Sequence, residues 1–265
     1  GDGSIYEIMQ GIKKRSDCDD ILKKLKLGHI GAGTSNGLSA SLAHASQERT
    51  TATDYAFMVA KGKTVPLDLS RYETSSANYL SFLTFSWAII ADVDIESEAL
   101  RWMGFVRMEV YSAWRVLNLR SYRAKLSYLP PTAVPLTKLP PLTKPLNKAD
   151  GWVTMEDDFC LFWASQVTHA GEALIAHPQC KPGDGLFHIF LVRNTVSRLR
   201  MLLILLALEH GSHVDMDSVE FIDCTAYRLE PISSGSYNDL DGEVIESGPV
   251  QGMVLQRATQ AYCNL

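Results

Sequence analysis

The sequence predicts an α+β fold in which a partial α/β lobe, residues 1–62, is followed by a mostly β lobe, residues 63–265. Three observations predict it. Apolar residues recur at helical spacing between short loops in the first 62 residues. From about Lys63 onward, alternating and β-rich apolar segments predominate. The chain has 265 residues, 46% of them hydrophobic, which is enough to bury a sizeable core. We expect a cleft between the two lobes.

The first lobe is read from helical stripes and from turns. Ile5, Ile8, Met9 and Ile12 share one face of a helix predicted over residues 4–14. A second helical segment is expected at 20–27, a short strand at 29–33 and a helix at 38–44. That last helix begins directly after Gly33-Thr34-Ser35-Asn36, and backbone N–H groups point outward where a loop becomes a helix.

The second lobe begins with apolar segments typical of strands. Residues 65–72 alternate apolar and polar, and residues 79–90 form a long β-rich run, so together they predict a hairpin. A helical interval at 96–118 precedes a strand at 124–129. Further strands are expected near 159–167, 186–193, 219–229 and 251–257, with one helix at 196–208. Six of the eleven prolines fall within 130–145, which predicts that 130–148 is an extended surface loop or a linker insertion.

Bulk properties exclude several classes of function. The net charge of −5 argues against binding to nucleic acid and against strong electrostatic adhesion to anionic lipid. The five cysteines are scattered without zinc-ligand spacing, which favours reduced thiols in a cytosolic protein. No segment approaches the roughly 20 apolar residues that a membrane span requires. Because the chain starts at Gly1 without a signal-type region, we expect it to be a fragment of a longer polypeptide.

Two glycine-rich stretches could hold phosphate. Gly1-Asp2-Gly3 places a carboxylate between residues that allow close backbone approach, just before a helix start. The same triplet recurs at Gly183-Asp184-Gly185, and an ordinary turn is the alternative interpretation of either copy. The segment from Gly31 to Gly37 combines small residues and two hydroxyls before a helix, the composition of a phosphate-binding nest.

Two acidic stretches are equally open to a structural interpretation. The run 91–98 concentrates four acids after an apolar segment, with Arg101 and Arg107 following. These residues form either a solvated cluster of helical ion pairs, or a site where an acid meets a cationic ligand and arginines bind phosphate. Asp241-Gly242-Glu243 is typical of a hairpin turn when considered alone.

The order of these motifs resembles the sphingosine kinase branch of the diacylglycerol-kinase-like lipid kinases. The resemblance rests on Gly-Asp-Gly-x-x-x-Glu at 1–7, the turn at 33–36, and the segments 86–98, 119–130, 196–198, 221–231 and 241–243. The run Ala-Asp-Val-Asp-Ile-Glu-Ser-Glu at 91–98 is its most specific part. The family pairs a nucleotide-binding α/β lobe, like that of NAD kinases, with a C-terminal β-sandwich lobe. Because the first part of that α/β lobe lies upstream of the Gly-Asp-Gly motif, the resemblance implies that this chain alone need not be active.

The resemblance also implies roles for individual residues. Asp2 matches the catalytic base of ATP-dependent phosphate transfer to the primary hydroxyl of sphingosine or a related sphingoid base, with Mg²⁺ accompanying the nucleotide. Residues matching nucleotide contacts are Gly1, Gly3, Gly33, Thr34, Ser35, Glu98, Arg101, Arg107, Asp241, Gly242 and Glu243. Thr34-Ser35 departs from the family's usual Ser-Gly, which bears on how closely phosphate approaches the turn. No residue is assigned to the metal.

The lipid site is expected around Asp94, which matches the acid that meets the amino group and hydroxyl of the lipid. The residues matching the wall of the tail pocket are Ile90, Val93, Met108, Leu174, Met201, Ile204 and Leu205, although each of them taken singly is more typical of plain core. We expect a cytoplasmic enzyme with transient membrane contact through apolar surface, and the sequence leaves a homodimer open. Diacylglycerol kinase, ceramide kinase and a non-catalytic lipid-binding fragment are the alternatives.

Overall fold

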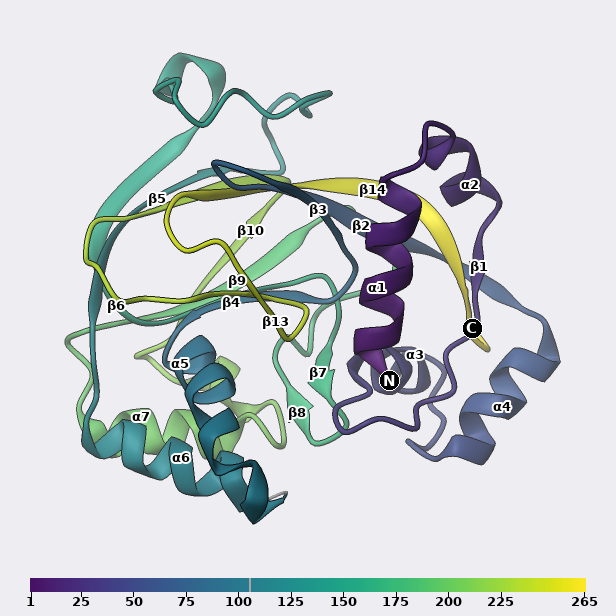
Figure 1. Ribbon diagram of the computed structural model, residues 1–265, viewed down its shortest axis with the longest axis horizontal. Helices are drawn as coiled ribbons and strands as arrows, with labels where there is room; N and C mark the ends of the chain where they lie inside the picture. Colours follow the sequence, from purple (N-terminus) through teal and green to yellow (C-terminus); the bar gives the residue numbers. More distant parts are fainter. Residues whose placement is uncertain (105) are drawn as a thin grey trace.

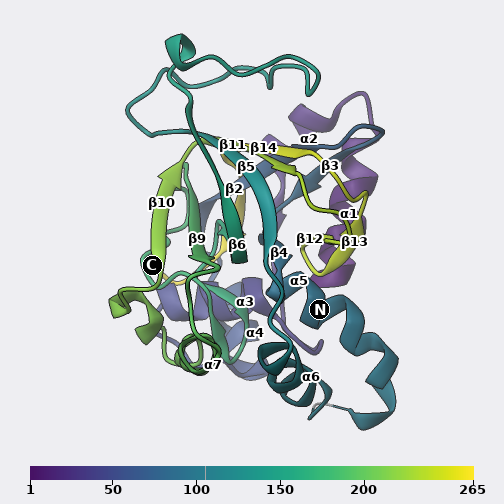
Figure 2. The ribbon, with the colours of Figure 1, turned by 90° about the vertical axis from the view of Figure 1, so that its left-hand side faces the viewer.

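The computed structural model describes residues 1–104 and 106–265 and confirms a mixed fold of helices and strands. Most strands join one sheet in the order β13-β12-β4-β6-β5-β11-β14-β2-β3, with β1 attached to β14 and with β9 and β10 attached beside β6. The helices lie around this sheet, as Figure 1 shows. One group of helices packs beside the N-terminus, and a second group packs under the opposite part of the sheet (Figure 2).

The N-terminal part is helical. Its elements are α1 (Asp2–Lys13), α2 (Cys18–Lys24), β1 (Lys26–Leu27), α3 (Gly37–Ala45) and α4 (Ala52–Lys61). The helices predicted at 4–14 and 38–44 are confirmed as α1 and α3. The helix predicted at 20–27 ends early because Lys26 and Leu27 pair in parallel with Gln260 and Ala261 of the last strand. The strand predicted at 29–33 is wrong, since these residues form an irregular approach to the turn before α3.

The sheet is built from antiparallel strands that follow α4. They are β2 (Thr64–Glu73), β3 (Asn78–Ser81), β4 (Thr84–Ala88), β5 (Tyr122–Leu129), β6 (Val153–Ser165), β9 (Phe187–Arg193), β10 (Glu220–Cys224), β11 (Ala226–Pro231), β12 (Asn238–Leu240), β13 (Glu243–Ile245) and β14 (Val250–Tyr262). A separate hairpin consists of β7 (His169–Gly171) and β8 (Leu174–Ile175). The predicted hairpin of β2 and β3 is confirmed, with Arg71 opposite Leu80.

Two apolar runs that were each predicted as one strand are divided. The run 79–90 breaks at Phe82-Leu83 and ends in a helix, because Ala88 adopts a positive φ of 63° before α5 begins at Ile89. The run 219–229 breaks at Thr225. The strand before this break pairs with β9, whereas the strand after it pairs with β5 and β14.

The second group of helices lies against the face of the sheet near β6 and β9. It comprises α5 (Ile89–Glu96), a 3₁₀ helix (Ser97–Met103), α6 (Val106–Leu117) and α7 (Arg198–Ala207). Shorter 3₁₀ turns lie at Lys148–Asp150 and Ser212–Asp215. The interval predicted as helical at 96–118 therefore holds two helices, and a further helix, α5, comes before it. The acidic run 91–98 lies on α5 and the start of the 3₁₀ helix, and α5 is seen below the strands in Figure 2.

Two large apolar cores hold much of the molecule together. An aromatic core within the sheet contains Tyr72, Phe85, Trp87, Phe159 and Tyr227, all fully buried. A second core joins α1, α3 and α4 to β2 and to the end of β14; its members include Met9, Leu42, Tyr55, Leu69 and Ala261. The helices of residues 1–62 therefore pack directly on strands of the following part.

The proline-rich segment is an extended surface loop, but it is not a free linker. The guanidinium of Arg228, which is 1% exposed, donates to the carbonyl oxygens of Pro140, Pro141, Leu142 and Lys144. Gln251 donates to the Pro140 carbonyl as well. Buried donors from β11 and β14 thus hold the loop at residues 140–144, because a buried guanidinium requires acceptors for its N–H groups.

All five cysteines are free thiols, four of them buried. Within residues 1–104 and 106–265, no helix is both long and apolar enough to cross a membrane.

Candidate active site

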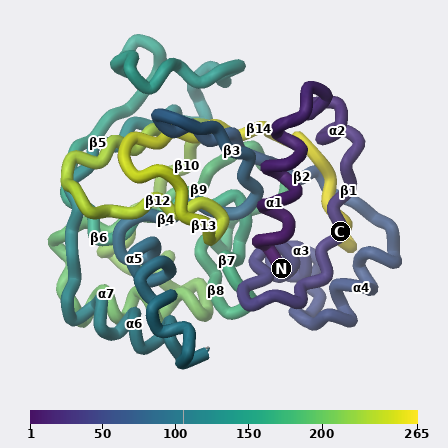
Figure 3. Tube along the Cα trace, in the orientation of Figure 1, coloured from purple at the N-terminus to yellow at the C-terminus, as the bar shows by residue number. Residues whose placement is uncertain are grey.

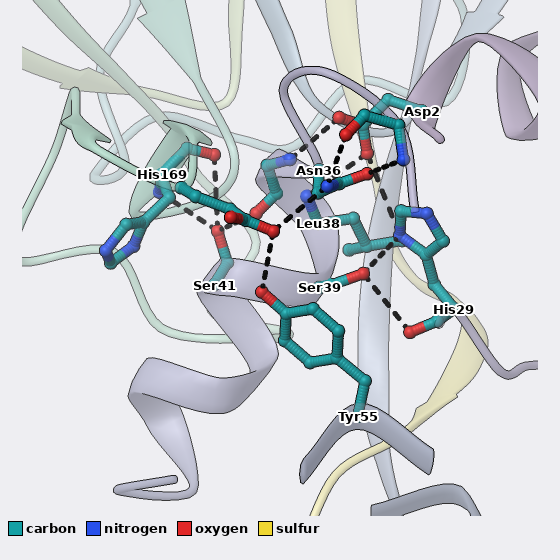
Figure 4. Close-up of polar contacts among 11 residues, drawn as sticks. Asp2, His29, Asn36, Leu38, Ser39, Ser41, Tyr55 and His169 are labelled. Atoms are coloured by element: carbon teal, nitrogen blue, oxygen red, sulfur yellow. Dashed lines mark hydrogen bonds and ion pairs between the residues drawn. The ribbon is translucent and has the colours of Figure 1, made fainter. Parts of the chain in front are cut away.

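Asp2 lies in the first turn of α1 and faces the first turn of α3. Its carboxylate is 7% exposed and accepts hydrogen bonds from the backbone N–H groups of Gly37 at 2.7 Å and Leu38 at 3.3 Å (Figure 4). The N-terminus of a helix favours a negative charge, because its first N–H groups have no partners within the helix. The contact joins the start of α1 to the turn that precedes α3.

The turn at residues 33–36 is held by Asn36, which adopts a left-handed φ of 54°. Its side chain accepts from Gly33 N–H at 2.8 Å and donates to the Gly33 carbonyl at 2.8 Å and to Glu172 at 2.9 Å. A Cβ at Gly33 would lie 2.7 Å from the Cα of Gly1, so glycine is required there. The structure therefore brings the two predicted phosphate-binding stretches into direct contact, with Thr34 and Ser35 exposed beside them.

Three polar residues near Asp2 and its turn, namely His29, Tyr55 and Glu172, were not predicted from the sequence. His29 Nδ1 lies 3.7 Å from the Asp2 carboxylate and 2.7 Å from Ser39 Oγ (Figure 4). Burial lowers the pKa of His29, which favours the neutral imidazole near neutral pH. Glu172 reaches the turn from the β7–β8 hairpin and also accepts a hydrogen bond from Tyr55. No motif identified these residues, since they are isolated in the sequence and meet only in the fold.

The Asp241-Gly242-Glu243 turn joins β12 to β13 and lies beside α1 (Figure 3). The buried Asp241 carboxylate accepts from Ser81 Oγ at 2.7 Å and from the N–H groups of Leu83 and Thr84 at 3.1 and 3.0 Å. Burial raises its pKa to about 7, and these hydrogen bonds oppose the rise. Asp241 therefore anchors the turn between β3 and β4.

Glu243 is exposed, and a Cβ at Gly3 would lie 3.9 Å from its carboxylate. Two predicted site stretches are therefore neighbours here, although 240 residues separate them in the chain. Glu243 is the member of this turn whose carboxylate remains open to the site.

Asp94 lies on α5, and its surroundings include the other predicted ionic residues. Burial raises the pKa of Asp94 to about 6, with Glu98 and Glu243 adding to the rise and Arg107 opposing it. Glu98 forms ion pairs with Arg107 and, at 2.8 Å, with Arg101. The structure thus gathers the predicted Glu98, Arg101 and Arg107 into one ionic cluster near Asp94.

The two aspartates of the acidic run play different parts. Asp92 is fully buried, forms an ion pair with Arg115 and accepts from the Tyr122 hydroxyl at 2.9 Å. It ties α5 to α6 and β5. Asp94 lies two residues later. Its pKa is shifted by burial and by neighbouring charges, and no hydrogen bond contributes to that shift.

All seven residues predicted to line a lipid tail belong to one apolar cluster between the sheet and the helices α5, α6 and α7. Val93, Met201 and Ile204 are buried members, and Ile90, Met108, Leu174 and Leu205 pack against them partly buried. Ile90 and Val93 are on the same helix as Asp94, so the apolar cluster begins where the ionic cluster ends.

The second Gly-Asp-Gly triplet serves the sheet. Asp184 accepts hydrogen bonds from the N–H groups of Lys181 and Leu186 and pairs with His188 at 3.0 Å. Its surroundings are those of a turn before β9, which is the structural interpretation that the sequence left open for this triplet.

Comparison with known proteins identifies relatives across the chain. A family described as the YegS C-terminal NAD kinase beta sandwich-like domain matches residues 108–262. A sphingosine kinase 1 of Mus musculus is 33% identical over 96% of this chain and 72% of its own length. A sphingosine kinase 2 of Arabidopsis thaliana is 29% identical over all of this chain and 60% of its own length. The crystal structure of a diacylglycerol kinase from Bacillus anthracis shares the fold, with a TM-score of 0.61 at 15% identity over all of this chain and 74% of that one.

Proposed function

The chain belongs to the sphingosine kinase family, and we propose that its site transfers the γ-phosphate of ATP to the primary hydroxyl of sphingosine or a related sphingoid base. The product is sphingosine 1-phosphate. One observation carries the proposal: α5 presents Asp94 to an ionic cluster while Ile90 and Val93 of the same helix enter an apolar cluster. A lipid with a cationic head group and an apolar tail matches this order of residues.

In this proposal Asp2 is the catalytic base. The substrate hydroxyl oxygen attacks the γ-phosphorus in line, the bond to the bridging oxygen of ADP breaks, and the hydroxyl proton passes to the Asp2 carboxylate. A carboxylate is a far weaker base than an alkoxide and cannot form one beforehand, so Asp2 orients the hydroxyl and accepts its proton late. The N–H groups of Gly37 and Leu38 hold the carboxylate in place for this role.

The phosphates of ATP would lie along the contact between the Gly1–Gly3 and Gly33–Asn36 stretches. The first stretch forms the start of α1 and the second ends at the start of α3, where N–H groups and the helix dipole favour anions. Close packing of Gly1 on Gly33 leaves no side chain between them. Arg107 and the more exposed Arg101 are the cations proposed to meet these phosphates, and rearrangement of their pairs with Glu98 would free them for that role.

Mg²⁺ would accompany the nucleotide rather than occupy a protein cage. In the part of the chain that the structure describes, no three His, Cys, Asp or Glu side chains are placed to hold a metal ion. Mg²⁺ commonly keeps several waters and is bound through substrate phosphates with one or two carboxylates. Glu243 is the exposed carboxylate nearest to Gly3 and is the residue that fits this role.

Asp94 selects the substrate in this proposal. The ammonium group of sphingosine offers a charge-assisted hydrogen bond to a mostly buried carboxylate, an interaction worth about 1.5–3 kcal/mol. Diacylglycerol and ceramide carry no cation, so the carboxylate would stay buried without a partner when they bind.

Access from a membrane would use the outer faces of α6 and α7. Val106, Val110 and Trp114 of α6 and Leu199 and Leu206 of α7 are exposed apolar residues next to the cluster assigned to the tail. Peripheral contact of this kind is transient, because it depends on a modest apolar area without a basic patch.

The test uses the full-length protein with labelled ATP and three acceptors: sphingosine, diacylglycerol and ceramide. We expect phosphate transfer to sphingosine, and Asp2→Asn should reduce it by about 10²-fold or more, the usual contribution of a positioned base. Asp184→Asn is the matched control, because it changes the same residue within the same triplet where Asp184 serves a turn. Transfer by Asp2→Asn at the parental rate would refute the assignment of the base, and transfer to diacylglycerol alone would refute the assignment of the substrate.

A further inference from the structure

A second acid, Asp239, faces the site from β12 and has no role in the proposal above. It lies opposite Ser86 of β4 in the strand pairing, and Ser86 Oγ donates to its Oδ2 at 2.6 Å. The residue is 6% exposed, and its Oδ1 is buried without a hydrogen-bond partner among the described residues. A buried polar atom without a partner is costly and calls for a physical reason, such as a bound ligand.

Asp94 is the charged neighbour that acts most strongly on Asp239. The two meet because α5 continues directly from β4 and packs against β12. Burial and the charge of Asp94 both raise the pKa of Asp239, whereas the Ser86 hydroxyl and the backbone N–H of Gly242 oppose the rise. Two carboxyl groups that lie close enough to act on each other oppose each other's ionisation, and a cation bound between them relieves that repulsion.

The neighbouring charges do not satisfy this pair. Asp241 is saturated by donors from the turn between β3 and β4, and Glu243 adds a further negative charge. Arg107 is the cation that acts on Asp94, and it is already paired with Glu98. Asp94 and Asp239 therefore present two acids at a place where a ligand could supply a cation and hydrogen-bond donors.

We propose that Asp239 is a specificity-determining residue that accepts a second N–H of the substrate ammonium through Oδ1 while Asp94 accepts the first. The inference rests on the proposed function and narrows its substrate class to long-chain primary amines. A primary ammonium carries three N–H groups, so it can donate to both carboxylates. Both acids accept from the ammonium as carboxylates, so two negative charges face one cation.

N-methylation of the substrate distinguishes binding by two acids from binding by one acid. An N,N-dimethyl ammonium keeps its positive charge but has a single N–H, so it can satisfy Asp94 or Asp239 but not both. The wild-type protein should therefore prefer the primary amine, and removal of Asp239 should abolish the preference.

The experiment measures dissociation constants of sphingosine and N,N-dimethylsphingosine for the full-length protein by calorimetry. We expect the wild type to bind sphingosine about tenfold more tightly, the factor that a charge-assisted hydrogen bond commonly provides. Asp239→Ala should bring the ratio close to one. Asp239→Asn keeps the shape of the side chain and an acceptor for Ser86, and it should lower the ratio partway. This variant replaces the alanine variant in the test if the latter does not fold.

Asp223→Asn is the control variant, because it removes one negative charge from β10, where Asp223 pairs with His188. It should keep the wild-type ratio. An unchanged ratio in both Asp239 variants, or no preference in the wild type, would overturn the inference. Phosphate transfer is measured in parallel: a preference that depends on Asp239 without any transfer would refute the kinase function and leave the two-acid site standing.

Discussion

Replacement of Asp94 by asparagine should stabilise the folded protein at neutral pH while weakening its use of sphingosine. The carboxyl group is mostly buried, and burial raises its pKa from 3.8 to about 6. Because of this raised pKa, keeping Asp94 ionised at pH 7 destabilises the folded state by at most about 3 kcal/mol relative to the unfolded chain. A neutral asparagine avoids this cost, so we expect Asp94→Asn to be more stable by about 1–3 kcal/mol at pH 7.

The sign of the pH dependence follows from the raised pKa. The folded state binds the proton more tightly than the unfolded chain, so this group favours folding most below pH 3.8 and loses that contribution as the pH rises through about 6. The stability gap between variant and wild type should therefore narrow towards pH 4. Substrate binding has the opposite trend, because protonation of Asp94 below pH 6 removes the negative charge that attracts the ammonium. Arg107, Glu98, Glu243 and Asp239 are the charged or titratable groups that share this environment.

Two measurements test this reasoning. Urea unfolding at pH 7 and pH 4.5 gives the stability difference, and steady-state kinetics gives KM for sphingosine and for ATP. We expect KM for sphingosine to rise about tenfold or more in Asp94→Asn, from the loss of a charge-assisted hydrogen bond, with little change in KM for ATP. A variant less stable than wild type at pH 7 would mean that a partner stabilises the carboxylate, and an unchanged KM for sphingosine would remove Asp94 from the head-group site.

Three further predictions concern the scaffold. Arg115→Met should cost about 3–5 kcal/mol in urea unfolding because it leaves Asp92 buried without its partner, and adding Asp92→Asn should recover most of the loss. Ala88→Gly should change the melting temperature little, because relief of about 1–3 kcal/mol of backbone strain at φ 63° offsets the lost methyl group. Ala124→Gly, at a buried position in β5, has no strain to relieve and should lower the melting temperature. Arg228→Gln should speed tryptic cleavage in the proline-rich loop, whereas unchanged cleavage would mean that the loop is held by other contacts.

The sequence predicted the local helices well and the division of strands poorly. The helix α1 follows a stripe of apolar residues at helical spacing, and such a pattern depends only on neighbours in the chain. The break at Phe82-Leu83 depends instead on Asp241. Its carboxylate, almost 160 residues away in the sequence, accepts from the N–H groups of Leu83 and Thr84. The spacing of apolar residues in the sequence gives no information about that contact. The same limit applies to β1, whose pairing with the last strand ended the predicted second helix early.

The acidic run shows what spacing alone leaves open. Asp92 and Asp94 are two residues apart, and in a helix such residues point in different directions. One meets Arg115 in the interior, and the other faces the site. Either aspartate could have held the structural position, since both belong to the same cluster of acids. Their roles are separated only when α6 and β12 are in place, which also explains why Asp239 carried no signal in the sequence.

The path of the chain at the end of β4 explains why the polar and apolar halves of the site adjoin. Ala88 turns the chain from the sheet into α5 with a positive φ, so the helix starts at the edge of the aromatic core instead of continuing the strand. Within a little more than one turn, α5 then presents Ile90 and Val93 to the apolar cluster and Asp94 to the acids of β12 and β13. An amphiphile bound along this helix would have its tail and its cationic head separated by about one helical turn. Diacylglycerol would fill the apolar part and leave two facing acids without a cation, so the same geometry that admits a long-chain amine opposes a neutral lipid.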